Sequence, residues 1–113
     1  MKRIVAFIKP NMLNDVIRAL HEIRNFPGAA ISNVKGVGKG LKEHLDESSH
    51  EPFHGMPESV RIESVCSDGQ LAMIMQVIEE NAHTGLPHDG KIFVSPVEDA
   101  VRIRTGERGN AAV

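Results

Sequence analysis

The order of secondary-structure signals is the feature that most constrains the fold of this chain. Apolar runs with strand character alternate with segments of helical spacing, and a stretch of about twenty residues without periodicity separates two halves. The expected strands are residues 4–8, 30–35, 60–66 and 91–97, and the expected helices contain residues 13–20 and 71–78. Two strand–helix–strand halves of similar length predict an α+β, ferredoxin-like βαββαβ sandwich with both helices on one face of the sheet.

Length and composition indicate one small domain, residues 1–113. The net charge of -2 does not suggest a nucleic-acid partner, and no apolar run approaches the roughly 18 residues needed for membrane insertion. The single cysteine, Cys66, excludes an internal disulfide and fits a reducing cytoplasm. It lies in an apolar strand run, which predicts a buried, inert thiol. A core without Trp or Tyr favours burial of further surface by oligomerisation.

The last quarter of the chain concentrates fixed cations beside a glycine turn. Asp89-Gly90 precedes Lys91, which opens an apolar strand, and Val101–Glu107 is expected to form another strand. Alternate strand residues share a face, so Arg102 and Arg104 should point the same way. Guanidinium groups beside a lysine and a glycine turn suit a polyanion such as a polyphosphate. The alternative is an edge strand with scattered, solvated charge.

The segment Gly36-Val37-Gly38-Lys39-Gly40 is rich in glycine. Glycine lets a backbone approach a nucleotide closely. No helical pattern follows the segment and the motif GxxxxGK[ST] is absent, so it is not a dinucleotide or P-loop fingerprint. The alternative interpretation is the flexible base of the long loop.

Three stretches resemble the PII signal-transduction proteins. They are GKIFVSPVEDAVRIRTGERGNAAV (residues 90–113), MKRIVAFIKP at the start, and NVKGVG (residues 33–38). The resemblance implies a homotrimeric, non-enzymatic regulator that binds ATP or ADP between subunits and controls a membrane transporter, a metabolic enzyme or a transcription factor. It also implies a T-loop-like segment at 38–57, a second nucleotide loop at 83–90, and a C-terminal strand and tail at 101–113.

The resemblance carries nucleotide-binding positions onto this sequence. They are Gly36, Val37, Gly38, Lys39, Val65, His88, Asp89, Gly90, Lys91, Arg102 and Arg104. Lys39 replaces the usual arginine, and His88 stands where the family usually has glycine. A Mg²⁺ ion accompanying the nucleotide is possible on the same grounds.

Other positions depart from the family pattern. Gly40 replaces a glutamine that helps to hold Mg²⁺, and Glu58 and Ser59 stand where a lysine would pair with 2-oxoglutarate. Pro52 stands where some members carry a modified tyrosine. Since Glu58 would repel a dicarboxylate, we expect a different effector, such as bicarbonate or a metal.

The long loop also contains His44, His50 and His54 among acidic residues. Imidazoles and carboxylates bind first-row metals, but these spacings match no tight metal motif, and solvated side chains are the simpler interpretation. A metal-binding module is therefore the alternative function, and a trimeric scaffold is a third. An enzyme is not expected, because no nucleophile–base pair or positioned general base is recognisable.

Overall fold

The fold is described from a computed structural model, which covers residues 1–37 and 58–113. Its main elements are β1 (Lys2–Ile8), α1 (Leu13–His21), β2 (Ala30–Lys35), β3 (Glu58–Cys66), α3 (Leu71–Ala82) and β4 (Gly90–Pro96). Short 3₁₀ turns occupy Pro10–Met12, Asp68–Gln70 and Gly109–Ala112. The predicted order of the four sheet strands and the two helices is confirmed.

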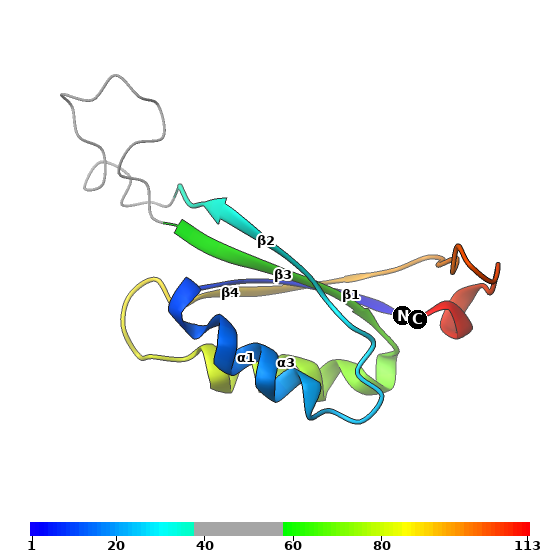
Figure 1. The fold of residues 1–113 in the computed structure, drawn as a ribbon, viewed down its shortest axis with the longest axis horizontal. Coiled ribbons are helices and arrows are strands. Elements are labelled where there is room, and N and C mark those ends of the chain that lie inside the picture. The colour runs from blue at the N-terminus through cyan, green and yellow to red at the C-terminus, as the bar shows by residue number, and fades with distance from the viewer. Residues whose placement is uncertain (38–57) are drawn as a thin grey trace, which may run out of the picture.

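The strands form an antiparallel sheet in the order β2-β3-β1-β4. Both α1 and α3 lie on one face of it (Figure 1). This is the predicted ferredoxin-like arrangement. It places the two central strands, β1 and β3, over the helices, while β2 and β4 form the edges.

The core lies between the helices and alternate residues of the central strands. Strand residues at period two face the helices, and helix residues at spacings of three and four face the sheet. The side chains that are almost wholly buried are Ile4, Ala6, Ile8, Val16, Leu20, Val60, Ile62, Cys66, Ile74 and Ile78. Burying each large aliphatic side chain contributes about 1.5–3 kcal/mol. Burial also raises the pKa of the Cys66 thiol, as expected of an unreactive core cysteine.

The other face of the sheet is open among the described residues (Figure 1). Val5 and Phe93 are register partners on this face, and the rings of Phe7 and Phe93 meet edge to face at 6.3 Å. Phe93 remains 54% exposed. Beside these rings, Glu63 is bound by Arg3 at 2.5 Å and Arg61 at 2.8 Å. An apolar patch with a satisfied charge cluster is thus left without a covering layer.

The expected strand at 101–107 is wrong. Val101 makes a single β-bridge with Arg108, and the residues between them form a turn. The Arg102 N–H donates to the Glu107 carbonyl at 2.9 Å, and the Gly106 N–H donates to the Arg102 carbonyl at 2.7 Å. Gly106 adopts φ +77°, a left-handed conformation that suits glycine and reverses the chain. Arg102 and Arg104 therefore lie on a turn, and the strand argument for their common face does not apply.

Candidate functional site

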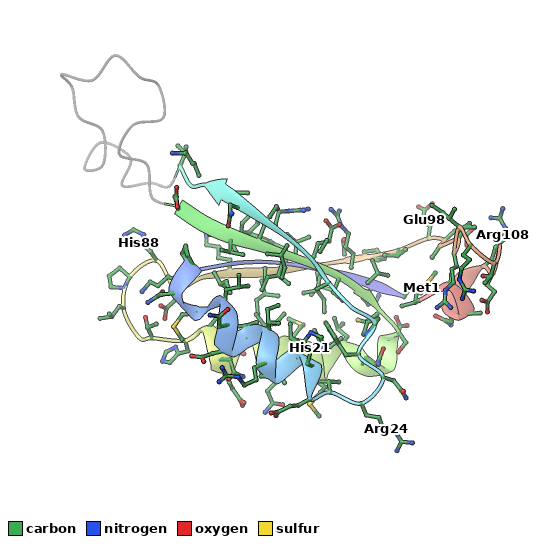
Figure 2. The ribbon with its side chains drawn as sticks, in the orientation of Figure 1. Met1, His21, Arg24, His88, Glu98 and Arg108 are labelled. Carbon is green, nitrogen blue, oxygen red and sulfur yellow. The ribbon has the colours of Figure 1, made fainter. Side chains whose placement is uncertain are left out.

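Several predicted site residues meet at one end of the sheet, which we call the loop end. Gly90 pairs with Ile8 there, and Lys35 pairs with Glu58. Gly36 and Val37 continue from β2, while His88, Asp89 and Lys91 belong to the 83–89 loop and the start of β4. Figure 2 labels His88 at this end. Gly38 and Lys39 lie outside the described residues, as do Gly40, Pro52 and the three histidines His44, His50 and His54.

The chain at Gly90 leaves no room for a side chain. Gly90 adopts φ +106°, and a Cβ there would lie 1.7 Å from the Phe7 carbonyl oxygen. His88, two residues earlier, is also left-handed at φ +71°, which is uncommon for a residue other than glycine. His88 therefore has the positive φ that a glycine readily adopts. The local backbone is dictated by close packing of the loop against β1.

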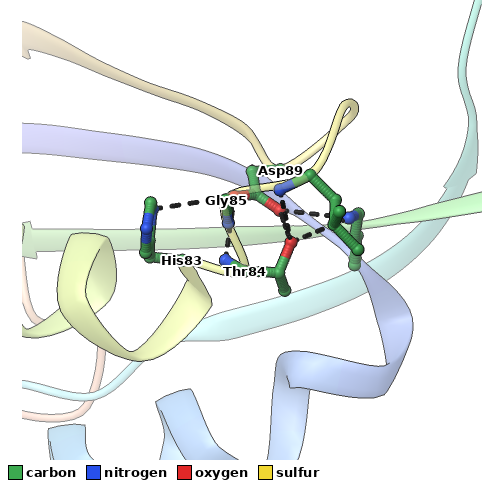
Figure 3. A network of polar contacts seen from close by, with 6 residues as sticks. His83, Thr84, Gly85 and Asp89 are labelled. Carbon is green, nitrogen blue, oxygen red and sulfur yellow. Dashed lines mark hydrogen bonds and ion pairs between the residues drawn. The ribbon is translucent and has the colours of Figure 1, made fainter.

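Asp89 directs its carboxylate into its own loop (Figure 3). The backbone N–H groups of Thr84 and Gly85 donate to Oδ2 at 2.8 and 2.9 Å. Oδ1 accepts from the Thr84 hydroxyl and lies 3.1 Å from Lys9 Nζ. The Thr84 hydroxyl, with the Thr84 amide, Lys9 and the Gly85 amide, holds the pKa of Asp89 well below its usual range.

Lys91 supplies an exposed cation on the open face of the loop end. It pairs in register with Phe7, so it stands on the open face of the sheet. Its side chain has no ion-pair partner within residues 1–37 and 58–113. An exposed, uncompensated ammonium group beside closely packed glycine backbone can receive an anion.

The remaining predicted residues lie at the opposite end, which we call the C-terminal end. Val65 pairs with Arg3 near the start of β1, and Arg102 follows β4. Val65 and Arg102 line a hollow of about 610 Å³ together with Ala30, Glu63 and Val113. Arg102 lies 3.7 Å from Glu107, and Arg104 is exposed on the turn.

Sequence reasoning missed Ala30 and Glu63 as lining residues. Glu63 stands two residues before Val65 on the same strand, so strand periodicity could have found it. Arg3 and then Arg61 lower the pKa of Glu63, and the carboxylate is therefore already compensated. Ala30 pairs with Glu63 across the β2–β3 ladder, a contact that requires the register.

The structure does not bring the two groups of predicted residues together within one chain. The seven residues of β1 run from one end of the sheet to the other, a span of roughly 20 Å at strand rise. Figure 2 shows the separation, with His88 at the loop end and Glu98 and Arg108 at the C-terminal end. Each end has cations and a glycine-shaped or hollowed backbone, so each can contribute half of an anion site.

No group of three His, Cys, Asp or Glu residues that could hold a metal occurs in the described part of the chain. The described residues therefore give no support to the alternative of a metal-binding module. Among the same residues, no helix is long and apolar enough to cross a membrane.

Comparison with known proteins gives a consistent answer. The family model described as "Nitrogen regulatory protein P-II" matches residues 1–107. A nitrogen regulatory protein P-II of Azospirillum brasilense is 44% identical over 115 residues, with all of both chains covered. One of Rhodospirillum rubrum is 43% identical over 115 residues, again with full coverage of both. Nitrogen regulatory protein P-II 1 of Methanothermobacter thermautotrophicus is 39% identical over 119 residues, covering all of this chain and 97% of that one. The chain therefore belongs to the nitrogen regulatory protein P-II family of signal-transduction regulators.

Proposed function

We propose that this protein is a regulator that binds ATP or ADP in clefts between the subunits of a homotrimer. The bound nucleotide biases residues 38–57, through which the protein controls a target such as a transporter, a metabolic enzyme or a transcription factor. Family membership and the distribution of cations support this proposal. The setting would be the cytoplasm, as the lone buried thiol suggests.

The observation that carries the proposal is the division of the site residues between two ends of one sheet. Lys91 stands at the loop end, and Arg102 and Arg104 stand beyond the other end of β1, a strand that spans roughly 20 Å. In a cyclic assembly with heterologous contacts, different surfaces of neighbouring copies meet. The loop end of one subunit would then face the C-terminal end of the next and complete the site.

The open face of the sheet offers the surface for such an assembly. Val5, Phe7 and Phe93 gather there, and Phe93 is largely exposed. Exposed contiguous apolar side chains are typical of protein–protein interfaces. We expect sedimentation to show a trimer at micromolar concentration and Phe93→Glu to shift it towards monomer. A wild-type monomer would contradict the assembly.

The polyphosphate would be held by side chains of both halves. Lys91 from one subunit and Arg102 with Arg104 from the next would contact phosphate oxygens, with Mg²⁺ as a possible partner of the phosphates. Gly36 and the exposed Val37, next to residues 38–57, lie at the same end as Lys91. Nucleotide phosphates at this place would be adjacent to the root of the segment that they are proposed to bias.

The second effector is proposed to differ from 2-oxoglutarate. Glu58 is exposed at the first position of β3, beside Lys35 in register, and its charge would oppose a dicarboxylate. Bicarbonate or a metal ion is the proposed alternative. We expect calorimetry with Mg²⁺ and ATP present to show weak or no binding of 2-oxoglutarate, and micromolar binding would contradict this.

Calorimetric titration with ATP and ADP tests the proposal. Arg102→Ala combined with Arg104→Ala should weaken binding at least tenfold, because each charge-assisted contact contributes about 1.5–3 kcal/mol. The matched control is Arg18→Ala with Arg24→Ala, which removes two exposed arginines from the helix side. Unchanged affinity in the first double variant, with the fold intact, would remove these arginines from the site.

A further inference from the structure

We propose that Asp89, Thr84 and Lys9 form a clamp that positions the 83–89 loop for phosphate binding, and that the Asp89 carboxylate itself does not touch the nucleotide. The proposal rests on the nucleotide function proposed above. It assigns Asp89 a positioning role within the loop, in place of the ligand role that the family resemblance implies. It also assigns a role to Lys9, which sequence reasoning left out of the site.

The Asp89 carboxylate makes its polar contacts inside the loop and with Lys9, and His83 Nδ1 lies 3.7 Å from Oδ2. A carboxylate has about four acceptor positions. Two are filled at Oδ2 by the N–H groups of Thr84 and Gly85, and two at Oδ1 by the Thr84 hydroxyl and Lys9. The Asp89 side chain is 25% exposed. An ionised carboxylate that already accepts these contacts is a poor neighbour for phosphate, because the two anions repel each other and neither donates a hydrogen bond.

Thr84 connects the carboxylate to the rest of the loop. Its hydroxyl donates to Asp89 Oδ1, accepts from Lys9 Nζ at 3.0 Å, and accepts from the Leu86 N–H at 3.2 Å. The backbone N–H of Thr84 also donates to Asp89 (Figure 3). Valine has the same shape as threonine but lacks the hydroxyl, so one substitution can separate the polar contacts from the packing.

Lys9 ties the loop to the sheet. It follows the last residue of β1, and its side chain is only 21% exposed because it reaches into the loop. Gly90 pairs with Ile8 by backbone contacts at the same place. The loop is thus fixed to β1 by its backbone and by an ion pair. Since Asp89 neutralises Lys9, Lys91 is an exposed cation on the open face of this end that remains available to phosphate.

The expected consequence is a loop that is ordered before the ligand arrives. Fixing the backbone of a loop costs conformational entropy. If the clamp orders the loop during folding, this entropy is not lost when the ligand binds, and binding is not weakened by it. The ordered loop would contact the phosphate groups and not the base or sugar, so ordering it should strengthen only the phosphate contacts. Loss of the clamp should therefore weaken ATP binding and leave adenosine binding unchanged, which general damage to the fold would not do.

The test uses three loop variants of the full chain. Thr84→Val and Asp89→Asn remove the clamp, and Thr84→Ser retains the hydroxyl as a rescue. Asp68→Asn is the matched control, because it removes another hydrogen-bonded carboxylate with a lowered pKa at the opposite end. Hydrogen exchange of residues 84–89 without nucleotide reports the loop, and calorimetry with ATP and with millimolar adenosine reports binding.

We expect Thr84→Val and Asp89→Asn to speed exchange of the loop amides and lower ATP affinity, each at least tenfold, with adenosine affinity unchanged. Thr84→Ser and Asp68→Asn should match wild type. Lost ATP affinity with unchanged exchange would show that Asp89 contacts the ligand and would overturn the clamp. Equal losses for ATP and adenosine, or faster exchange with unchanged ATP affinity, would also overturn it. A wild-type protein that binds no ATP would instead refute the proposed function, while exchange would still report whether the clamp orders the loop.

Discussion

The two ends of the sheet differ in how their functional side chains are held. At the loop end, Asp89 and Lys9 form an ion pair with each other, and Gly90 is packed against the Phe7 carbonyl. At the C-terminal end, Arg104 is exposed on a turn, and Ile103 beside it is 98% exposed. The loop end is held by contacts within its own chain. The C-terminal end exposes side chains that its own chain does not cover. The difference agrees with the proposal that the C-terminal end is completed by a neighbouring subunit.

Glycine substitutions should give the largest difference between the two ends in the free energy of unfolding. Gly90→Ala should lower the free energy of unfolding by about 3 kcal/mol or more, because it combines backbone strain with a clash against the Phe7 carbonyl. Gly106 is also left-handed, at φ +77°, but no atom lies within 4 Å of the place that a Cβ would occupy. Gly106→Ala should therefore cost only about 1–2 kcal/mol. Denaturant unfolding measures both.

Gly69→Ala is the control for these two substitutions. Gly69 has open space around it and no left-handed strain, so the substitution should be close to neutral. Equal losses for Gly90→Ala and Gly106→Ala would show that close packing does not distinguish the ends.

Hydrogen exchange should show the same contrast at single residues. The amides of Thr84 and Gly85 donate to Asp89, whereas within the described residues Ile103 and Arg104 show no amide hydrogen bond of their own. We expect the first pair to exchange at least tenfold more slowly without ligand. Similar rates at both ends would mean that the Asp89 contacts do not persist in solution.

Acid should weaken the loop end more than the C-terminal end. A carboxylate whose pKa is lowered by folding stabilises fully above its unfolded pKa, near 4, and loses that contribution as pH falls towards the folded pKa. Asp89 has several donors and Asp68 has one hydrogen bond, to the N-terminal ammonium group. We therefore expect the free energy of unfolding to fall below about pH 4, and Asp89→Asn to flatten this decline more than Asp68→Asn does. Equal slopes would contradict the comparison.

The fold could be predicted from the sequence because the spacing of apolar residues is two in the strands and three to four in the helices. Ile4, Ala6 and Ile8 are alternate residues of β1 that face the helices. Val16 and Leu20 of α1 belong to the same buried core. The same reasoning failed after Val101. The alternation of Arg102 and Arg104 has strand period, but the turn at Gly106 and the lack of a continuous partner strand prevent a ladder.

The sequence proposes residues for the candidate site but not their arrangement in space. Lys91 and Arg102 were predicted from the sequence as nucleotide-binding residues, and both are exposed cations, yet their placement at opposite ends depends on strand direction and register. The inward orientation of Asp89 depends on Thr84 and Lys9, which are distant from each other in sequence. Contacts of this kind leave no periodic signal in the chain.

Mixed trimers test most directly the central claim that each nucleotide site uses two chains. Lys91→Ala would disable the loop half, and Arg102→Ala with Arg104→Ala would disable the other half in a second chain. Each protein alone should bind ATP at least tenfold more weakly than wild type. After equimolar unfolding and joint refolding, each mixed trimer should contain one intact junction, which restores about a quarter of the wild-type number of high-affinity sites for random assembly. Calorimetry that detects this restored fraction would support the two-chain site. A refolded mixture with no more high-affinity binding than the separate variants, although mixed trimers have formed, would contradict it.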